Sequence, residues 1–249
     1  MGSIGSNLQE VKRRIAAACA LAGRDANIFT RAPAPGAFDA PPCGVTLLAV
    51  SKTWPAAALR EAHAAGQQAF GENQVQEALA KIEALADLRA RLQWHLIGPL
   101  QSNKTRAVAE QFDWVHSVDR LKIAERLAEQ RPAGLPPLDL CLQVNISGEA
   151  SKSGVAPADL RALAHAVVAL PAERVRLRGL MAIPAPATGR DAQRAPHREL
   201  AALLAVLRGD GLALDTLSMG MSDDLEAAVL EGATVVRVGS AIFGGRPRA

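Results

Sequence analysis

A lysine follows directly on the end of a short apolar run in this sequence. The run Val45–Val50 is succeeded by Ser51, Lys52 and Thr53. An amine held in a partly dry pocket mouth could attack an aldehyde and form a Schiff base. The alternative is a solvated lysine at a strand terminus, and the spacing alone does not separate the two. Lys52 is therefore the first candidate for covalent chemistry.

A second chemical signal is an arginine inside an apolar run. Arg237 lies between Val236 and Val238. An unpaired buried guanidinium is very costly, so a strand-embedded arginine implies a partner. That partner is either an inward carboxylate in an ion pair or an acceptor on a bound ligand.

Small and hydroxylic residues gather after the last two apolar runs. Ser222 comes directly before a helix that we expect to begin near Asp223, and Gly239 and Ser240 follow the final run. Ser222 could cap that helix and donate to a phosphate, Gly239 allows close backbone approach, and Ser240 adds a hydroxyl. Asp223 and Asp224 would repel a phosphate, so we expect both to face solvent.

Polar residues also follow three earlier apolar runs, with roles that the pattern leaves open. Asn73 could cap a helix or offer its amide to a ligand oxygen. His95 alternates with apolar neighbours, so it is either a satisfied core residue or a site residue. The segment Val144–Gly154, which contains Lys152, crowds polar side chains and two glycines together. A flexible turn would show the same composition.

The frame that brings these residues together is predicted by an alternation of short apolar runs with helical stretches. Strands are predicted at Val45–Val50, Ala69–Gly71, Gln93–Ile97, Trp114–Ser117, Leu138–Asn145, Arg176–Ala182, Thr216–Ser218 and Thr234–Val238. Helices are predicted at Leu8–Ala22, Ala56–Ala65, Val75–Leu92, Lys104–Gln111, Arg120–Gln130, Pro157–Ala169, Gln193–Arg208 and Asp223–Glu231. The segments Thr30–Gly44, which has four prolines, and Ala185–Pro196 are predicted as loops.

Alternating strands and helices imply parallel pairing with crossover helices. Eight such units favour closure into a (β/α)8 barrel, in which functional residues collect at the carboxyl ends of the strands. A doubly wound sheet is the alternative, but no GxGxxG motif follows the first strand.

The composition excludes several classes of protein. A length of 249 residues suits one barrel, and 21% charged residues of mixed sign argue against disorder. The net charge of +3 mildly favours an anionic ligand. Eight aromatic residues without a tyrosine, and no dense Lys/Arg run, argue against nucleic acid. Three scattered cysteines argue against disulfides or a thiolate zinc site and favour a cytoplasmic location. We expect no secretory signal and no membrane span.

Seven segments in order resemble the pyridoxal phosphate homeostasis protein family. They are Val50–Thr53, Phe70–Asn73, Trp94–Lys104, Val144–Gly154, Gly179–Met181, Ser218–Ser222 and Arg237–Gly244. The resemblance implies a single (β/α)8 TIM-type barrel of PLP fold type III, similar to the N-terminal domain of alanine racemase but without its extra β domain. Residues 1–249 would then form one PLP-binding domain, with a proline-rich loop at about 30–44.

The resemblance also implies roles for individual residues around pyridoxal 5′-phosphate. Lys52 would carry the cofactor as an aldimine, and Arg237 would contact the pyridine nitrogen. Ser222, Gly239 and Ser240 would hold the phosphate. The other implied cofactor-binding residues are Ser218 and Met221, close to the phosphate, and Asn73, near the ring. His95 and Lys152 match family positions, and their roles stay open.

The implied function is to carry, buffer or deliver PLP inside the cell as a monomer, with PLP-dependent apo-enzymes as partners. The alternative is a PLP-dependent amino-acid racemase or decarboxylase of low activity. Alanine racemase uses a tyrosine from its extra domain as a second base, and this chain has no tyrosine. A guanidinium on the pyridine nitrogen would also weaken the electron sink that carbanion chemistry needs. We therefore expect a non-catalytic protein. A third hypothesis is a phosphate-binding barrel that forms no Schiff base.

Overall fold

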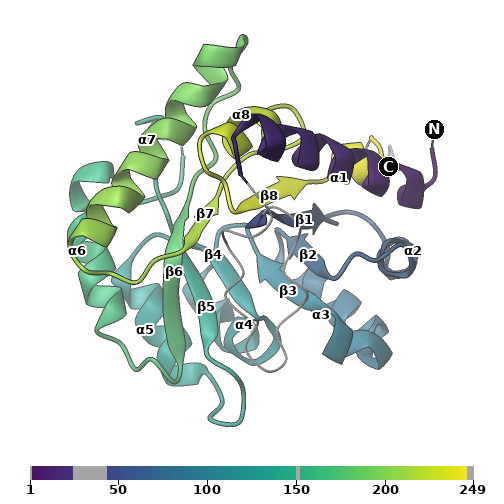
Figure 1. Ribbon diagram of the computed structural model, residues 1–249. Helices are drawn as coiled ribbons and strands as arrows, with labels where there is room; N and C mark the ends of the chain where they lie inside the picture. The colour runs from purple at the N-terminus through teal and green to yellow at the C-terminus, as the bar shows by residue number, and fades with distance from the viewer. Residues whose placement is uncertain (1, 25–43, 150–151, 246–249) are drawn as a thin grey trace.

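The computed structural model describes residues 2–24, 44–149 and 152–245. Within them, eight parallel strands close into a barrel in the order β1 to β8, with helices on the outside (Figure 1). The strands are β1 (Thr46–Val50), β2 (Ala69–Glu72), β3 (Gln93–Leu96), β4 (Trp114–Val118), β5 (Leu138–Gln143), β6 (Val175–Met181), β7 (Thr216–Ser218) and β8 (Val235–Val238). The predicted barrel and all eight of its strands are confirmed.

Helices of two kinds surround the barrel. The α-helices are α1 (Ile4–Leu21), α2 (Ala56–Ala64), α3 (Val75–Ala84), α4 (Thr105–Gln111), α5 (Leu121–Gln130), α6 (Pro157–Val168), α7 (Arg190–Gly209), α8 (Leu225–Leu230) and α9 (Ser240–Phe243). The 3-10 helices are η2 (Ala86–Arg91) and η3 (Ser102–Lys104). No described helix is long and apolar enough to cross a lipid bilayer.

The observed helices differ from the predicted ones at several places. Helix α1 begins at Ile4, four residues before the predicted start at Leu8. The predicted helix Val75–Leu92 is divided into α3 and η2 at the buried Leu85, because the chain leaves the α conformation there. Helix α7 begins at Arg190, inside the predicted loop, so Pro196 lies within the helix. Helix α8 begins only at Leu225. The short helix α9 was not predicted at all.

One predicted segment lies almost wholly outside the described residues. The proline-rich segment Thr30–Gly44 is described only at Gly44. Its loop structure stays a prediction, as does the assignment of residues 1–249 to a single domain.

The barrel closes through the pairing of β1 with β8, which places Leu48 opposite Arg237. On the other side of β1, Val50 lies opposite Gly71 of β2. Side chains alternate between the two faces of each strand. One buried cluster contains Leu48, Val50, Ala69, Ile97 and Val235. A second contains Trp114, Cys141 and Met181. Since all strands are parallel, their carboxyl ends meet at one end of the barrel.

Helix α1 precedes the barrel in sequence and packs against α8 and α9 (Figure 1). Its buried side chains recur at helical spacing: Leu8, Val11, Ile15, Ala18 and Cys19. The Asn7 amide donates to the carbonyl of Ile242 at 2.9 Å. Arg14 binds Glu226 at 2.6 Å and the carbonyl of Ser222 at 2.9 Å. Helix α1 therefore supports the two loops that follow β7 and β8.

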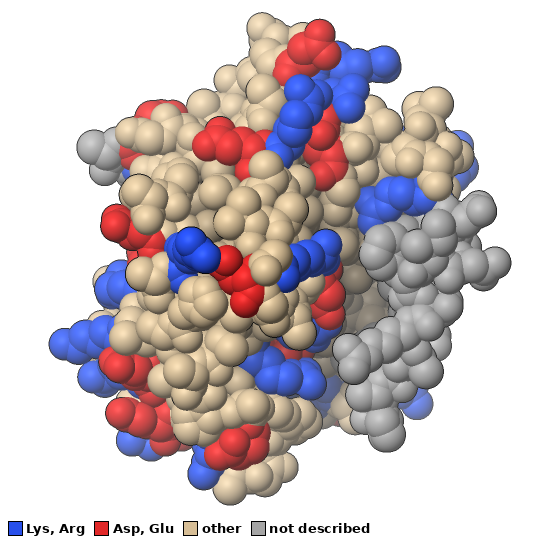
Figure 2. Space-filling view, turned by 60° about the vertical axis from the view of Figure 1, so that its left-hand side comes forward, with Lys and Arg blue, Asp and Glu red and all other residues tan. Residues whose placement is uncertain are grey.

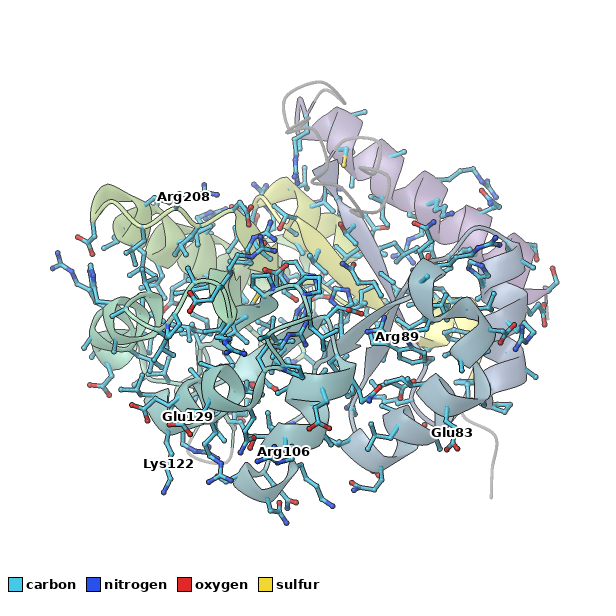
Figure 3. All side chains as sticks on the ribbon, turned by 90° about the horizontal axis from the view of Figure 1, so that it is seen from below. Glu83, Arg89, Arg106, Lys122, Glu129 and Arg208 are labelled. Carbon is cyan, nitrogen blue, oxygen red and sulfur yellow. The ribbon has the colours of Figure 1, made fainter. Side chains whose placement is uncertain are left out.

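Charged side chains of both signs lie among uncharged residues on the outside of the barrel. Arg106, Lys122 and Glu129 are exposed on the outer helices α4 and α5, as Figure 3 shows from below. On the face in Figure 2, basic and acidic residues are interspersed. That face lacks the single-sign basic patch that nucleic-acid binding uses.

Candidate functional site

Lys52 lies directly after β1, at the carboxyl end of the barrel, and is half-buried. Within the described part of the chain its amine has no hydrogen-bond or ion-pair partner. The next residue, Thr53, has a φ of 69°, a left-handed conformation that is unusual for a β-branched side chain. Such a backbone costs about 1–2 kcal/mol and must be held by its surroundings. The turn that presents Lys52 is therefore a constrained structure.

A buried cluster of charges holds the backbone on both sides of Lys52. The Lys81 Nζ atom lies 2.7 Å from the carbonyl oxygen of Ser51, from Glu72 Oε1 and from Glu77 Oε1. The Ser51 hydroxyl donates to Glu72 Oε1 at 2.6 Å. Glu77 Oε1 also accepts the backbone N–H of the residue after Lys52, at 2.5 Å. The cluster thus fixes the peptide groups that flank the lysine.

Glu72 is the most enclosed charged residue of this cluster, with an exposed fraction of 0%. Burial raises the pKa of its carboxyl, and the contacts with Lys81 and Ser51 oppose that rise only in part. The sequence interpretation missed Glu72 and Lys81. A glutamate at a strand end and a lysine among the buried positions of the next helix were the available signals.

The loops after β7 and β8 bring the predicted phosphate-binding residues together. The Ser240 hydroxyl donates to the Ser222 hydroxyl at 3.1 Å, although 18 residues separate them. A Cβ atom on Gly239 would lie 3.0 Å from the carbonyl oxygen of Val50, so this position favours glycine. Ser240 opens α9, whose first N–H groups have no acceptor within the helix.

Asp224 does not face solvent as the sequence predicted. Its Oδ1 atom accepts the N–H of Met221 at 2.6 Å, and its Oδ2 atom lies 3.0 Å from Nε2 of the buried His197. Burial would raise the pKa of Asp224, but these hydrogen bonds outweigh it and the pKa is lowered. The Asp224 carboxylate therefore links the loop after β7 to its own backbone and to helix α7. Asp223 is exposed, as expected.

Arg237 is buried inside the barrel with an exposed fraction of 3%. Its Nη1 donates to the Ser218 hydroxyl and its Nη2 to the carbonyl of Ala182, both at 2.8 Å. Burial lowers the pKa of the guanidinium to about 10. No carboxylate of the described residues forms an ion pair with it, so the predicted alternative of an inward carboxylate is wrong there. Its remaining N–H groups are available to a further acceptor.

Asn73 follows β2 and carries an unsatisfied polar atom. Its Oδ1 is buried and has no hydrogen-bond partner among the described residues. Its backbone packs against the loop after β3, where a Cβ atom on Gly98 would lie 2.1 Å from the Asn73 carbonyl oxygen. A buried amide oxygen without a partner is costly, which favours a ligand that donates to it.

The contact between these two loops yields a prediction. Replacing Gly98 with alanine should lower the free energy of unfolding by about 1–3 kcal/mol and displace Asn73, because the new methyl group overlaps backbone. Urea unfolding would measure the change. Gly134→Ala is the control, since nothing lies within 4 Å of a Cβ atom there. Equal effects of the two substitutions would contradict the assigned packing.

The three remaining predicted residues occupy different surroundings. His95 lies inside the barrel on β3 rather than at a strand end, with its Nδ1 2.9 Å from His116 Nε2. Lys152 lies in the loop after β5 and pairs with Glu149 at 3.0 Å. Met221 is exposed at 37%. The sequence interpretation missed His116, whose signal was a polar residue at alternate spacing within a buried strand.

Together these groups could hold a ligand of defined chemistry. An amine without a partner could bind an aldehyde, and two hydroxyls beside a helix terminus could bind a phosphate. A guanidinium with uncommitted donors could bind a ring nitrogen. No group of three or more His, Cys, Asp or Glu residues in the described ranges could hold a metal ion.

Comparison with known proteins agrees with this chemistry. Residues 40–247 match the model of the alanine racemase N-terminal domain. The pyridoxal phosphate homeostasis protein of Pseudomonas aeruginosa is 61% identical over 246 residues, covering 99% of this chain and 97% of that protein. Its counterpart in Escherichia coli K12 is 51% identical over 247 residues, covering 99% and 98%.

Solved structures show the same barrel. PipY of Synechococcus elongatus, with PLP bound, is 47% identical with a TM-score of 0.73, covering 82% of this chain and 94% of that one. Alanine racemase from Corynebacterium glutamicum shares the fold at 19% identity and a TM-score of 0.65, and the match covers 99% of this chain but 62% of the racemase. The described residues contain the barrel and no second domain.

Proposed function

Because this chain belongs to the pyridoxal phosphate homeostasis protein family, within the alanine racemase N-terminal domain family, we propose that it binds pyridoxal 5′-phosphate on Lys52 and serves PLP homeostasis in the cytoplasm. The observation that carries the proposal is the uncommitted, half-buried amine of Lys52 at the same barrel end as the Ser222–Ser240 hydroxyl pair. A relative of 47% identity is described with PLP bound, which supports the choice of ligand.

Each residue of the site would do a separate part of the binding. Lys52 would hold the cofactor through its amine, because the bound cofactor would supply an aldehyde with which that amine can form a Schiff base with loss of water. Ser222, Gly239 and Ser240 would hold the phosphate through hydroxyls and backbone N–H groups. Arg237 would donate to the pyridine nitrogen, and Asn73 would lie near the ring with its unpaired amide oxygen.

The protein would carry or buffer the cofactor and deliver it to PLP-dependent apo-enzymes as a monomer, with little or no turnover of its own. The names of the relatives support a homeostatic role. The chain contains no tyrosine that could act as a second base in racemisation. Arg237 would stay positively charged at neutral pH, because its pKa is lowered only to about 10. A cation beside the ring nitrogen would keep that nitrogen unprotonated and so weaken the electron sink that carbanion chemistry needs.

An absorption spectrum before and after borohydride reduction, followed by peptide mapping, tests the binding proposal. We expect a yellow protein whose reduced adduct maps to Lys52. A colourless protein that gains no absorption band on addition of PLP would instead support a phosphate-binding barrel without a Schiff base. Assays against a panel of amino acids test the carrier role. Robust turnover would overturn it in favour of a racemase or decarboxylase.

A further prediction concerns Arg237. Arg237→Lys keeps a cation but loses the planar fork, so we expect a shifted absorption maximum of the bound cofactor and release about tenfold faster. Spectra and dialysis of the loaded protein would measure both. An unchanged spectrum and release rate would mean that the guanidinium serves only Ser218 and the Ala182 carbonyl.

A further inference from the structure

A chain of buried polar side chains runs through the barrel interior and ends at Arg237. Arg237 Nη1 lies 2.8 Å from Ser218 Oγ, which lies 2.8 Å from His116 Nδ1. His116 Nε2 lies 2.9 Å from His95 Nδ1, and His95 Nε2 lies 3.0 Å from Gln93 Oε1. Four strands contribute to this chain, namely β3, β4, β7 and β8.

The directions of the hydrogen bonds follow from the Gln93 end of the chain and from the neutral form of both histidines. Gln93 Oε1 can only accept, so His95 must donate from Nε2. A neutral His95 then accepts at Nδ1, which makes His116 the donor from its own Nε2. A neutral His116 accepts at Nδ1, so the hydroxyl proton of Ser218 points to His116.

Burial in the barrel interior favours the neutral form of both histidines. Both are buried, with exposed fractions of 2% for His95 and 0% for His116. Burial lowers the pKa of His95 to about 3. It also lowers the pKa of His116 well below its usual value, and the neighbouring His95 and the Arg237 guanidinium lower it further.

The consequence for Ser218 is that its only proton is committed to His116. Toward Arg237 its oxygen can act only as an acceptor, and the guanidinium can act only as a donor. We propose that His116 and His95 are positioning residues that act through Ser218 to hold the Arg237 guanidinium in one orientation toward the cofactor. This inference rests on the proposed function of Arg237 as the partner of the pyridine nitrogen.

A purely structural purpose would not need this chain. The neighbouring part of the interior is filled by apolar side chains, namely Leu48, Val50, Ala69, Ile97 and Val235. Buried polar groups are costly unless each is satisfied, and an apolar filling of the same volume is often equally stable. The polar chain ends at Arg237, and the ring of Trp114 stacks on His95 with 5.5 Å between the ring centroids.

The first test needs no cofactor and so separates this inference from the proposed function. Nitrogen-15 NMR of the cofactor-free protein should show His95 and His116 as neutral tautomers protonated at Nε2. The sequence contains five histidines, so single substitutions would assign the signals. A proton on Nδ1 of His116 would overturn the inference even if PLP binds at Lys52.

The second test compares two substitutions of His116 in the PLP-loaded protein. His116→Asn places an amide oxygen near the position of Nδ1 and can still accept from Ser218, whereas His116→Gln places its amide near Nε2 and cannot. We expect His116→Gln to shift the absorption maximum and to speed cofactor loss on dialysis about tenfold. His116→Asn should lie within about threefold of the unsubstituted protein.

The pair also excludes a role in packing alone. Both substitutions remove the imidazole ring, so a structural role would make their spectra and release rates equal. That outcome would overturn the inference. If PLP does not bind at all, the proposed function fails, and the NMR result still decides the direction of the chain.

Discussion

Lys52→Ala is expected to remove covalent cofactor binding completely. The variant should be colourless after gel filtration and should yield no adduct on borohydride reduction. The reason is that the described turn between β1 and α2 contains no lysine besides Lys52. The loss should occur without unfolding. Lys52 is half-buried and has no partner among the described side chains, so its removal should change the free energy of unfolding by less than about 1 kcal/mol.

Lys122→Ala is a matched control for this experiment. Lys122 is exposed on α5, on the outer layer of helices (Figure 3). Its replacement should leave the spectrum and the adduct unchanged. A Lys52→Ala protein that still gives a reduced lysine adduct would place the amine elsewhere and would contradict the site.

Lys81→Met is expected to have the largest effect on stability. It removes the cation that contacts Glu72, Glu77 and the carbonyl of Ser51. Glu72 would remain as a buried carboxylate without a counter-charge, so the free energy of unfolding should fall by about 3–5 kcal/mol. Cofactor retention should weaken as well, because the turn on either side of Lys52 would lose its anchor. Urea unfolding and dialysis of the loaded protein would measure the two effects.

The stability deficit of Lys81→Met should depend on pH in a defined direction. Burial already raises the pKa of Glu72 in the folded protein, and loss of Lys81 would raise that pKa further. A group with a raised folded pKa favours folding at low pH and loses that contribution as pH rises through the folded pKa. The deficit should therefore be greatest at neutral pH and shrink as the pH falls toward the usual carboxyl range.

Two further variants separate the buried charge from a general loss of packing. Glu72→Gln combined with Lys81→Met should recover much of the deficit, because no isolated carboxylate remains. Arg106→Met breaks an exposed pair with Glu110, whose atoms lie 3.9 Å apart, and should cost at most about 0.5 kcal/mol. A deficit for Lys81→Met that is equally small and independent of pH would show that Glu72 is neutral in the native state.

The sequence by itself determined the barrel and the ends of its strands. Eight apolar runs alternate with helical stretches, and parallel strands must place their carboxyl ends together. This local pattern was sufficient to bring Lys52, Ser222 and Gly239 to one end of the barrel. Polar residues that interrupt apolar runs, such as Arg237, were equally visible because burial makes them costly.

Only the tertiary structure decided which groups these residues contact. Arg237 binds Ser218 and the carbonyl of Ala182, 19 and 55 residues away in sequence, rather than a carboxylate. His116 reaches Ser218 across a separation of 102 residues. No periodicity encodes such pairs, because they depend on the register between strands.

The course of the turns was likewise outside the reach of sequence patterns. Asp224 suits a helix terminus, yet it turns back to the N–H of Met221 and to His197, a residue of a different helix. Lys81 can occupy a buried position of α3 because its ammonium group is satisfied there by Glu72 and by the carbonyl of Ser51, the residue before Lys52. The sequence determined that an amine would stand at the barrel end. The tertiary structure determined that buried charges would hold its backbone while the amine itself stayed free of partners among the described residues.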